Sequence, residues 1–191
     1  LLLFEATRGR KELPIAFIED AIGAKWESVS GKISEGDALF TGPMKLNDGC
    51  VKIKFLDGGC IFMQAPIEFT LESPHQVFLQ SGRLTASLHN AQKQTFMVRT
   101  MYCSIVDYGT EFGVSICPDG VAEAHVFQGK IQIRDSSDPI KFVNSLFVEE
   151  GQGATTELSG GILKIRPKEV DFRQFVQPEE FFSQCKATQG S

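Results

Sequence analysis

The sequence predicts an all-β protein, and three observations support this class. From residue 32 onward, apolar and β-branched runs of about four to seven residues end in Gly, Pro, Asn or Asp at intervals of about eight to twelve residues. No amphipathic helical pattern separates successive runs, which excludes a parallel α/β architecture. The 191 residues include 16 Phe and 18 Gly, typical of a globular chain with many turns. We expect many short strands in a twisted, β-solenoid-like or sandwich-like domain.

Residues 1–25 are expected to precede this domain. Leu1–Phe4, followed by three basic residues, is consistent with the end of a membrane helix and a linker. It is too short to span a bilayer, which needs about 20 apolar residues. A short buried strand or the start of a helix is the alternative. Further on, Ile15, Ile18 and Ile22 have helical spacing, but nearby Pro and Gly residues limit this stretch to a short helix at most.

The β domain is expected over residues 26–167. Its strands are predicted to end at turn signals, which in the first half are Gly42-Pro43, Asn47-Asp48-Gly49, Asp57-Gly58-Gly59, Pro66, Pro74 and Ser81-Gly82. The Gly-rich stretch 151–163 lacks the Lys-Ser/Thr ending of a phosphate-binding loop, which favours a hairpin connection. Residues 168–191 are polar, Pro-punctuated and Phe-rich. We expect a tail that docks a few Phe side chains or leads into another module.

Charge and cysteine usage narrow the function classes. The net charge is −5 and no stripe of Lys and Arg occurs, so nucleic acid is not an expected partner. The five cysteines are Cys50, Cys60, Cys103, Cys117 and Cys185. They show no metal-ligand spacing, and the first four lie in strand-like runs, where buried thiols are expected. A Cys103–Cys117 disulfide is the alternative, if the chain folds back on itself between them.

Candidate catalytic and metal-binding residues each have a simpler interpretation. The three histidines are His75, His89 and His125. None has the spacing of a metal site, so structural histidines and no metal or cofactor are expected. Cys117 with His125 lacks a third, orienting residue. Asp107 and Glu111 could form the carboxylate pair of a hydrolase. They lie on either side of a predicted bend, however, and Asp, Gly and Thr are themselves bend-forming residues, which favours a structural role.

The stretch "VDYGTEFGV" is interpreted as a structural corner. Gly109 permits a positive φ or a close backbone approach, and the Thr110 hydroxyl can satisfy local backbone groups that leave the ladder. Phe112 and Val114 then restart the period-two alternation and are expected to point into the core. Gly129 occupies an equivalent position in "HVFQGKIQI". This stretch is therefore predicted to do mechanical rather than chemical work.

These motifs, taken in order, resemble the FecR family of periplasmic signal-transducing proteins. The motifs are "SGRLTASL", "TFMVRT", "IVDYGTEFGVSI" and "DGVAEAHVFQGKIQI", and the likeness extends from Trp26 to Arg134, more weakly to Pro167. The matching positions include Phe96, Val98, Thr100, Val106, Asp107, Gly109, Thr110, Phe112, Val114, Val126, Gly129, Ile131 and Ile133. One departure is Met101, where the family frequently has Pro.

The resemblance implies a non-enzymatic, extracytoplasmic sensor or interaction domain. In that family the domain is periplasmic and is anchored to the inner membrane by a single-pass helix. It passes an envelope signal, of which iron–siderophore uptake is one candidate, toward an extracytoplasmic-function sigma factor. Implied partners are the signalling domain of an outer-membrane receptor or an envelope protein, and a sigma factor bound through a cytoplasmic segment outside this chain. Partner strands would bind at an exposed sheet edge.

Two other functions stay open at this stage. The first is a carbohydrate-binding or cell-envelope scaffold module, for which the sequence offers only Trp26, Tyr102 and Tyr108 as aromatic platforms besides Phe. The second is a hydrolase built on the two carboxylates named above.

Overall fold

The computed structural model describes residues 12–27, 33–88, 95–136 and 144–181, together with 183 and 185. Its strands join into one branched, 13-stranded sheet, which confirms the all-β prediction. The strands are β1 (Ala16–Trp26), β2 (Ala38–Leu39), β3 (Gly42–Phe55), β4 (Cys60–Ser73), β5 (Gln76–Ser87), β6 (Met97–Arg99), β7 (Cys103–Asp107), β8 (Glu111–Ile116), β9 (Ala122–Gln128), β10 (Lys130–Asp135), β11 (Ser145–Glu149), β12 (Gln152–Ser159) and β13 (Ile162–Glu169). Two short 3₁₀ turns follow, η1 (Phe172–Gln174) and η2 (Pro178–Glu180). No helix in the described part of the chain has the length and apolar character needed to cross a membrane.

The predicted short helix near the N-terminus is wrong, because those residues form strand β1. β1 pairs antiparallel with β3, and Ile18 lies opposite Ile53 in the buried ladder. Alternation also explains the burial, since Ala16 and Ile18 are buried while Phe17 between them is exposed. β1 is thus part of the sheet, although its residues precede the boundary expected at residue 26.

Several predicted turns lie inside long strands instead of between short ones. β3 and β4 each have 14 residues, and β5 has 12. The Asn47-Asp48-Gly49 signal falls within β3, Pro66 within β4 and Ser81-Gly82 within β5, each at a register shift. These bulges line up across neighbouring strands, because Ile22 pairs with Cys50, Cys50 with Gln64 and Gln64 with Arg83 just beside them. We call this line of irregularities the crease.

The crease folds the long strands so that their two halves face each other. His75, which follows β4, has its Nδ1 atom 3.1 Å from Oδ2 of Asp57, which precedes β4. A straight strand of this length would separate its ends by about 45 Å at roughly 3.3 Å per residue. β4 therefore doubles back at Pro66, and its halves belong to two opposed layers. One continuous apolar core lies between them.

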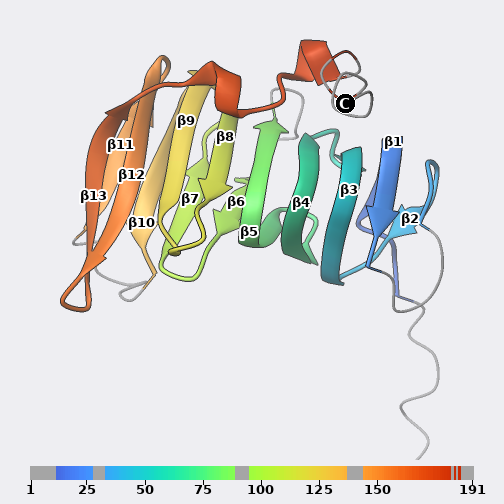
Figure 1. The fold of residues 1–191 in the computed structure, drawn as a ribbon, viewed down its shortest axis with the longest axis horizontal. Helices are drawn as coiled ribbons and strands as arrows, with labels where there is room; N and C mark the ends of the chain where they lie inside the picture. The colour runs from blue at the N-terminus through green and yellow to red at the C-terminus, as the bar shows by residue number, and fades with distance from the viewer. Residues whose placement is uncertain are drawn as a thin grey trace, which may run out of the picture.

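β5 shows how the remaining strands join the two layers. Its first half pairs in parallel with β6, whereas its second half pairs antiparallel with β8. One layer continues through β6, β7, β10 and β11, and the other through β8, β9, β12 and β13. Figure 1 shows the strands arrayed side by side along the long axis of the molecule, with each strand running across that axis. Beyond β6, the described chain crosses between the layers after β7, β9 and β11, and Gly109, Gly129 and Gly151 lie at these crossings with positive φ.

The C-terminal segment crosses the outer face of the β8–β9 layer. We define the strap as residues 170–181 together with Cys185. Figure 1 shows it in red, passing from the end of β13 over β9 and β8 toward β4 and β3. Phe175, Val176 and Phe181 of the strap are buried against the sheet, which confirms the docking of Phe side chains, while a lead into another module stays a prediction.

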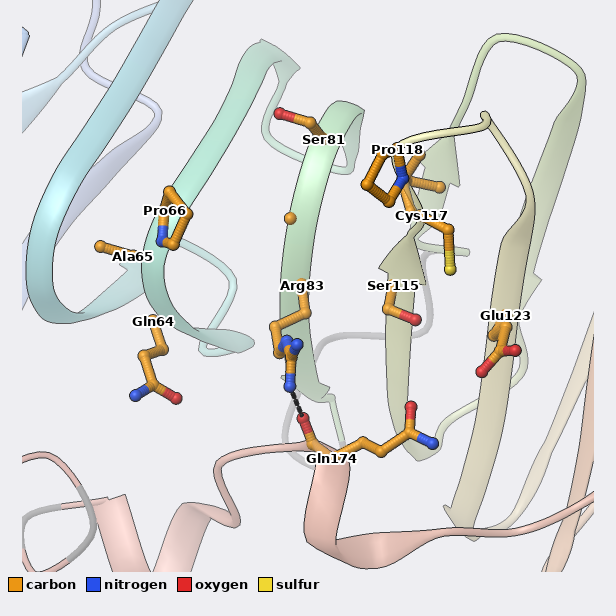
Figure 2. Close-up of a pocket in the computed structure, with 12 residues that line it drawn as sticks. Gln64, Ala65, Pro66, Ser81, Arg83, Ser115, Cys117, Pro118, Glu123 and Gln174 are labelled. Carbon is orange, nitrogen blue, oxygen red and sulfur yellow. Dashed lines mark hydrogen bonds between the residues drawn. The ribbon is translucent and has the colours of Figure 1, made fainter. Parts of the chain in front are cut away.

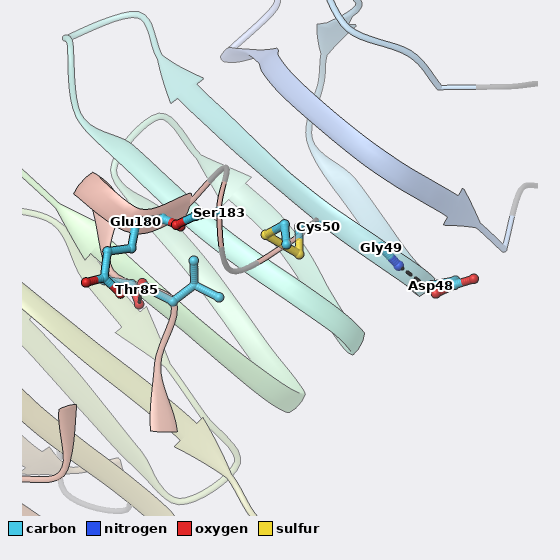
Figure 3. Close-up of a disulfide and its surroundings, with 8 residues drawn as sticks. Asp48, Gly49, Cys50, Thr85, Glu180 and Ser183 are labelled. Atoms are coloured by element: carbon cyan, nitrogen blue, oxygen red, sulfur yellow. Dashed lines mark hydrogen bonds between the residues drawn. A yellow bond between two sulfur atoms is a disulfide. The ribbon is translucent and has the colours of Figure 1, made fainter. Parts of the chain in front are cut away.

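A disulfide ties the end of the strap to β3. Cys50 and Cys185 are bonded across a sequence separation of 135 residues, as Figure 3 shows. The prediction of a buried free thiol at Cys50 is therefore wrong. Cys103 and Cys117 are both free, so the alternative disulfide between them is also wrong. Cys103 begins β7 and Cys117 directly follows β8, and these two strands do not pair because they belong to different layers.

Candidate functional site

The predicted corner is built around the Asp107 carboxylate at the end of β7. Only 3% of Asp107 is exposed. One oxygen accepts a hydrogen bond from Gly109 N at 2.9 Å, and the other accepts from Thr110 N at 2.8 Å and from the Thr110 hydroxyl. The hydroxyl was expected to bond local backbone, and it bonds this carboxylate instead. Asp107 thus satisfies the backbone donors that the turn removes from the ladder.

The two glycines singled out in the sequence meet at this corner. Gly109 and Gly129 both have φ +87°. A Cβ atom on Gly129 would lie 2.7 Å from Cγ2 of Thr110, whereas a Cβ atom on Gly109 would meet nothing within 4 Å. Gly109 is therefore needed for its backbone conformation alone, and Gly129 is needed for its conformation and for space.

The other motif residues also have structural positions. Phe112 and Val114 are fully buried in the core, as predicted. The buried Thr100 closes the turn between β6 and β7, where its hydroxyl accepts from Cys103 N at 3.0 Å and contacts Cys103 O at 3.1 Å. Met101 lies exposed at this turn. The motif residues therefore shape two successive connections, the turn between β6 and β7 and the crossing from β7 to β8.

The corner holds an aromatic residue on the outer surface. Tyr108 is 48% exposed and Phe147 of β11 is 49% exposed, and their ring centroids are 6.1 Å apart. Lys130 Nζ lies 5.1 Å from the centroid of Phe147 and 5.9 Å from that of Tyr108, within the range of cation–π attraction. The sequence pointed to Tyr108, but no pattern marked Phe147 or Lys130.

Polar side chains fix the orientation of the Tyr108 ring. Its hydroxyl donates to Gln132 Oε1 at 3.2 Å and accepts from Arg134 Nη2 at 3.0 Å. Arg134 also donates to Gln132 through Nε at 2.9 Å. We call Tyr108, Lys130, Gln132, Arg134 and Phe147 the aromatic patch. Preordered Tyr and Arg side chains of this kind are enriched where proteins bind proteins.

The other aromatic platforms considered from the sequence are less available. Trp26 and Tyr102 are half-buried and pack against the core. Trp26 lies against Phe69, with 6.4 Å between ring centroids. Of the three, Tyr108 alone is exposed.

The Asp107 carboxylate at the corner is engaged by the backbone of the turn. Both oxygens of Asp107 accept hydrogen bonds from the turn. Glu111 begins β8, in register with Ser87 of β5 and Gln128 of β9. Asp107 is thereby a structural acceptor whose oxygens face the corner rather than a substrate.

His125 lies buried beneath the strap. Its Nδ1 accepts from Asp171 N at 3.0 Å, and its Nε2 lies 3.6 Å from Oε2 of Glu123, beyond ordinary hydrogen-bond range. Burial lowers the pKa of His125, against the opposing pull of the nearby Glu123 carboxylate. His125 is consequently neutral near pH 7 and supports the strap. His89 lies outside the described residues.

The free thiols differ in burial, because Cys103 is buried as predicted, whereas Cys60 and Cys117 are only half-buried, so the prediction is wrong for these two. Burial raises the pKa of Cys103 to about 11 and also raises the pKa of Cys60 and Cys117. Thiols with raised pKa are poor nucleophiles at neutral pH. Within the described ranges, no group of three or more His, Cys, Asp and Glu side chains is arranged to hold a metal ion.

A groove lies beside the strap, where the crease meets the β8–β9 hairpin. Its volume is about 590 Å³, and Figure 2 shows Arg83, Ser115 and Glu123 along it. Arg83 Nη1 donates to the backbone oxygen of Gln174 in the strap at 2.7 Å. The groove is thus bounded on one side by the strap.

The same fold occurs in crystal structures of a candidate anti-sigma factor from Parabacteroides distasonis ATCC 8503. One structure superimposes with a TM-score of 0.52 at 13% sequence identity, covering 68% of this chain and 61% of that chain. A second gives a TM-score of 0.54 at 12% identity, covering 69% and 62%. At this identity the likeness shows the fold, and the chain matches about three fifths of the length of those neighbours. No family model and no curated protein matches the sequence.

Proposed function

We propose that this chain is a non-enzymatic, extracytoplasmic interaction domain of an anti-sigma-type regulator, and that it binds a protein partner through the aromatic patch. The observation that carries the proposal is the corner itself. The corner places Tyr108 beside Phe147 and Lys130, Gln132 and Arg134 hydrogen-bond its hydroxyl, and both rings are exposed. A neighbouring edge suits the same task, because β11 pairs only with β10 among the described strands. A partner strand could add there and contact both rings.

The regulatory role draws on two further supports. The fold is shared with a candidate anti-sigma factor, and the order of sequence motifs resembles the FecR family. In this proposal the sigma factor binds a cytoplasmic segment outside this chain, and the β domain receives the envelope signal. The inducing signal, with iron–siderophore uptake as one candidate, would arrive through a receptor or another envelope protein.

The Cys50–Cys185 disulfide supports an extracytoplasmic location. Structural disulfides persist in oxidising compartments such as the periplasm and are rare in the cytosol. A periplasmic domain anchored to the inner membrane in the full-length protein is consistent with this chemistry. Fractionation with thiol-trapping in the native host tests the location, because a cytosolic domain would be recovered with both thiols free.

Signalling by the full-length protein tests the proposal. In the Tyr108→Ala/Phe147→Ala variant, the signal-dependent change in transcription from sigma-dependent promoters is expected to be at least tenfold smaller than in the wild type. The matched control is Leu158→Ala/Ile162→Ala, which removes two exposed side chains from the β12–β13 hairpin. Unchanged signalling by the patch variant, at equal protein level, would contradict the proposal.

A carbohydrate-binding or scaffold role is the alternative that the same rings allow. Sugars stack on flat aromatic faces, whereas the planes of Tyr108 and Phe147 are tilted by 47°. A glycan array distinguishes the two functions. A specific glycan that binds the wild type and fails to bind the Tyr108→Ala/Phe147→Ala variant would favour the alternative.

A further inference from the structure

The face beneath the strap donates hydrogen bonds to the backbone of the strap. Arg83 Nη1 donates to Gln174 O at 2.7 Å, and the Thr85 hydroxyl donates to Val176 O at 2.8 Å. The two donors are two residues apart on β5, and the two acceptors are two residues apart on the strap. Phe175, between the two acceptors, has the extended backbone (φ −125°, ψ 144°) that lets alternate carbonyls point the same way, and Gln174 is the last residue of η1. These contacts would suit any extended segment, whatever its side chains at those positions.

Between these two contacts, one aromatic side chain enters a recess made by a glycine. A Cβ atom on Gly113 of β8 would lie 2.5 Å from the Phe175 ring. The ring also packs against His125 at 5.3 Å and Phe127 at 5.8 Å between centroids. Phe175 is almost fully buried there. Any larger residue at Gly113 would fill the recess. The missing side chain at Gly113 therefore makes room for an aromatic ring of the strap.

A second aromatic anchor and the disulfide hold the far end of the strap. The Phe181 ring packs edge-to-face against Phe62 of β4, with 5.4 Å between centroids. These rings, Val176 and the disulfide form a small apolar cluster apart from the main core. Figure 3 shows the disulfide on the outer side of the sheet, next to this segment. The strap is thus held by the Phe172, Phe175 and Phe181 rings and a few hydrogen bonds, and the Cys50–Cys185 bond is its covalent latch.

We propose that this face is a binding surface for an extended peptide with an aromatic anchor, occupied by the strap and latched by the disulfide. A dithiol reductant would release the latch. Two electrons pass from the dithiol to the disulfide, giving the Cys50 and Cys185 thiols and an oxidised, disulfide-bonded reductant. An extended segment of another protein with the same chemistry then displaces the strap. This surface lies on the opposite layer from the aromatic patch, and the inference does not depend on sigma-factor regulation.

The groove beside the strap gives an incoming segment a place to bind first. It borders Gln174 and contains Arg83, which is one of the two side chains that donate hydrogen bonds to carbonyls of the strap. Figure 2 shows the Arg83 side chain reaching from β5 to the strap at the margin of this groove. A competing backbone can therefore approach the donor before the strap leaves.

Hydrogen exchange on the wild-type chain tests the latch. After treatment with a dithiol, peptides covering 171–176 are expected to exchange at least tenfold faster, while peptides from β3–β5 keep their protection. A strap that stays equally protected with both thiols free would overturn the proposal. Loss of protection throughout the sheet would also overturn it, because the disulfide would then be a requirement for folding.

A peptide in trans tests the binding surface. The probe is a fluorescent peptide with the sequence of residues 170–181, added to the full chain carrying Cys50→Ala, Cys185→Ala, Phe175→Ala and Phe181→Ala, which weaken the resident strap. Fluorescence anisotropy is expected to show saturable binding, at least tenfold weaker for the peptide with Phe175→Ala. No binding to a folded chain, or equal binding of both peptides, would contradict the proposal. If this variant does not fold, the exchange experiment on the wild type decides.

Discussion

Replacing the two corner glycines one at a time separates backbone strain from steric fit. An L-residue at φ +87° costs about 1–2 kcal/mol relative to glycine, and the smaller entropy of the unfolded alanine chain offsets about 0.4–1 kcal/mol. Gly109→Ala meets no neighbour, so it should lower the free energy of unfolding by about 1 kcal/mol. Gly129→Ala adds a methyl group 2.7 Å from Thr110, and overpacking adds about 1–3 kcal/mol. The expected loss for Gly129→Ala is about 2–4 kcal/mol.

Urea unfolding followed by far-UV circular dichroism measures both variants against the wild type. For a chain of this size each kcal/mol corresponds to a Tm change of about 2–4 °C, so differential scanning provides a second readout. The Thr110→Ser/Gly129→Ala double variant is the matched control, because it removes the methyl group that the new Cβ would meet. The reasoning is refuted if Gly109→Ala and Gly129→Ala cost the same, or if Thr110→Ser does not relieve Gly129→Ala.

Three further predictions use the same unfolding assays. Asp107→Asn should lower the free energy of unfolding by about 1–3 kcal/mol, since one amide oxygen cannot replace two carboxylate acceptors. Glu111→Gln should change the free energy of unfolding by less than about 0.5 kcal/mol. Equal costs for the two variants would argue against the structural role of the corner. Cys185→Ala should cost about 2–5 kcal/mol, and an unchanged Tm would show that the strap adds no stability. The lowered pKa of His125 means that the unfolded chain binds its proton first as pH falls, so the free energy of unfolding should decrease below about pH 6.5. His125→Asn should lose that part of the pH dependence, and an identical slope in both proteins would contradict the assignment.

The corner was predictable because its signals are local. Gly109 and Gly129 require a positive φ, and Phe112 and Val114 show period-two alternation on one strand. Both properties follow from a few consecutive residues. The contact between Gly129 and Thr110 was not predictable, because it depends on how two crossings between layers meet.

The crease could not be distinguished from a series of turns. Gly49, Pro66 and Gly82 have the chemistry of turns, and they do redirect the chain. In a hairpin the chain reverses within one sheet, whereas here β4 crosses to the opposite layer and keeps β3 and β5 as its neighbours. Which of the two occurs depends on partner strands far away in sequence. The helical spacing of Ile15, Ile18 and Ile22 was misleading for the same reason, because β1 forms backbone hydrogen bonds with the distant strand β3 along most of its length.

The candidate surfaces were the least predictable part. Cys50 and Cys185 are separated by 135 residues, and no spacing rule connects them. Phe147 lies in a strand whose alternation places it on the surface, where one more Phe among 16 carries no signal. Only the three-dimensional arrangement brings it to Tyr108. Long-range contacts of this kind form the two candidate surfaces, whereas local sequence patterns predict the all-β fold class.

Site-specific photocrosslinking in the native host tests the central claim most directly. A photoreactive phenylalanine analogue is placed at Phe147 in the aromatic patch and, as a control, at Leu158, which is similarly exposed on the other layer. We predict a covalent adduct with an envelope protein from position 147 that is absent at position 158 and is lost with Tyr108→Ala. Adducts of equal yield at both positions, or none at position 147 while the protein is signalling, would contradict the account.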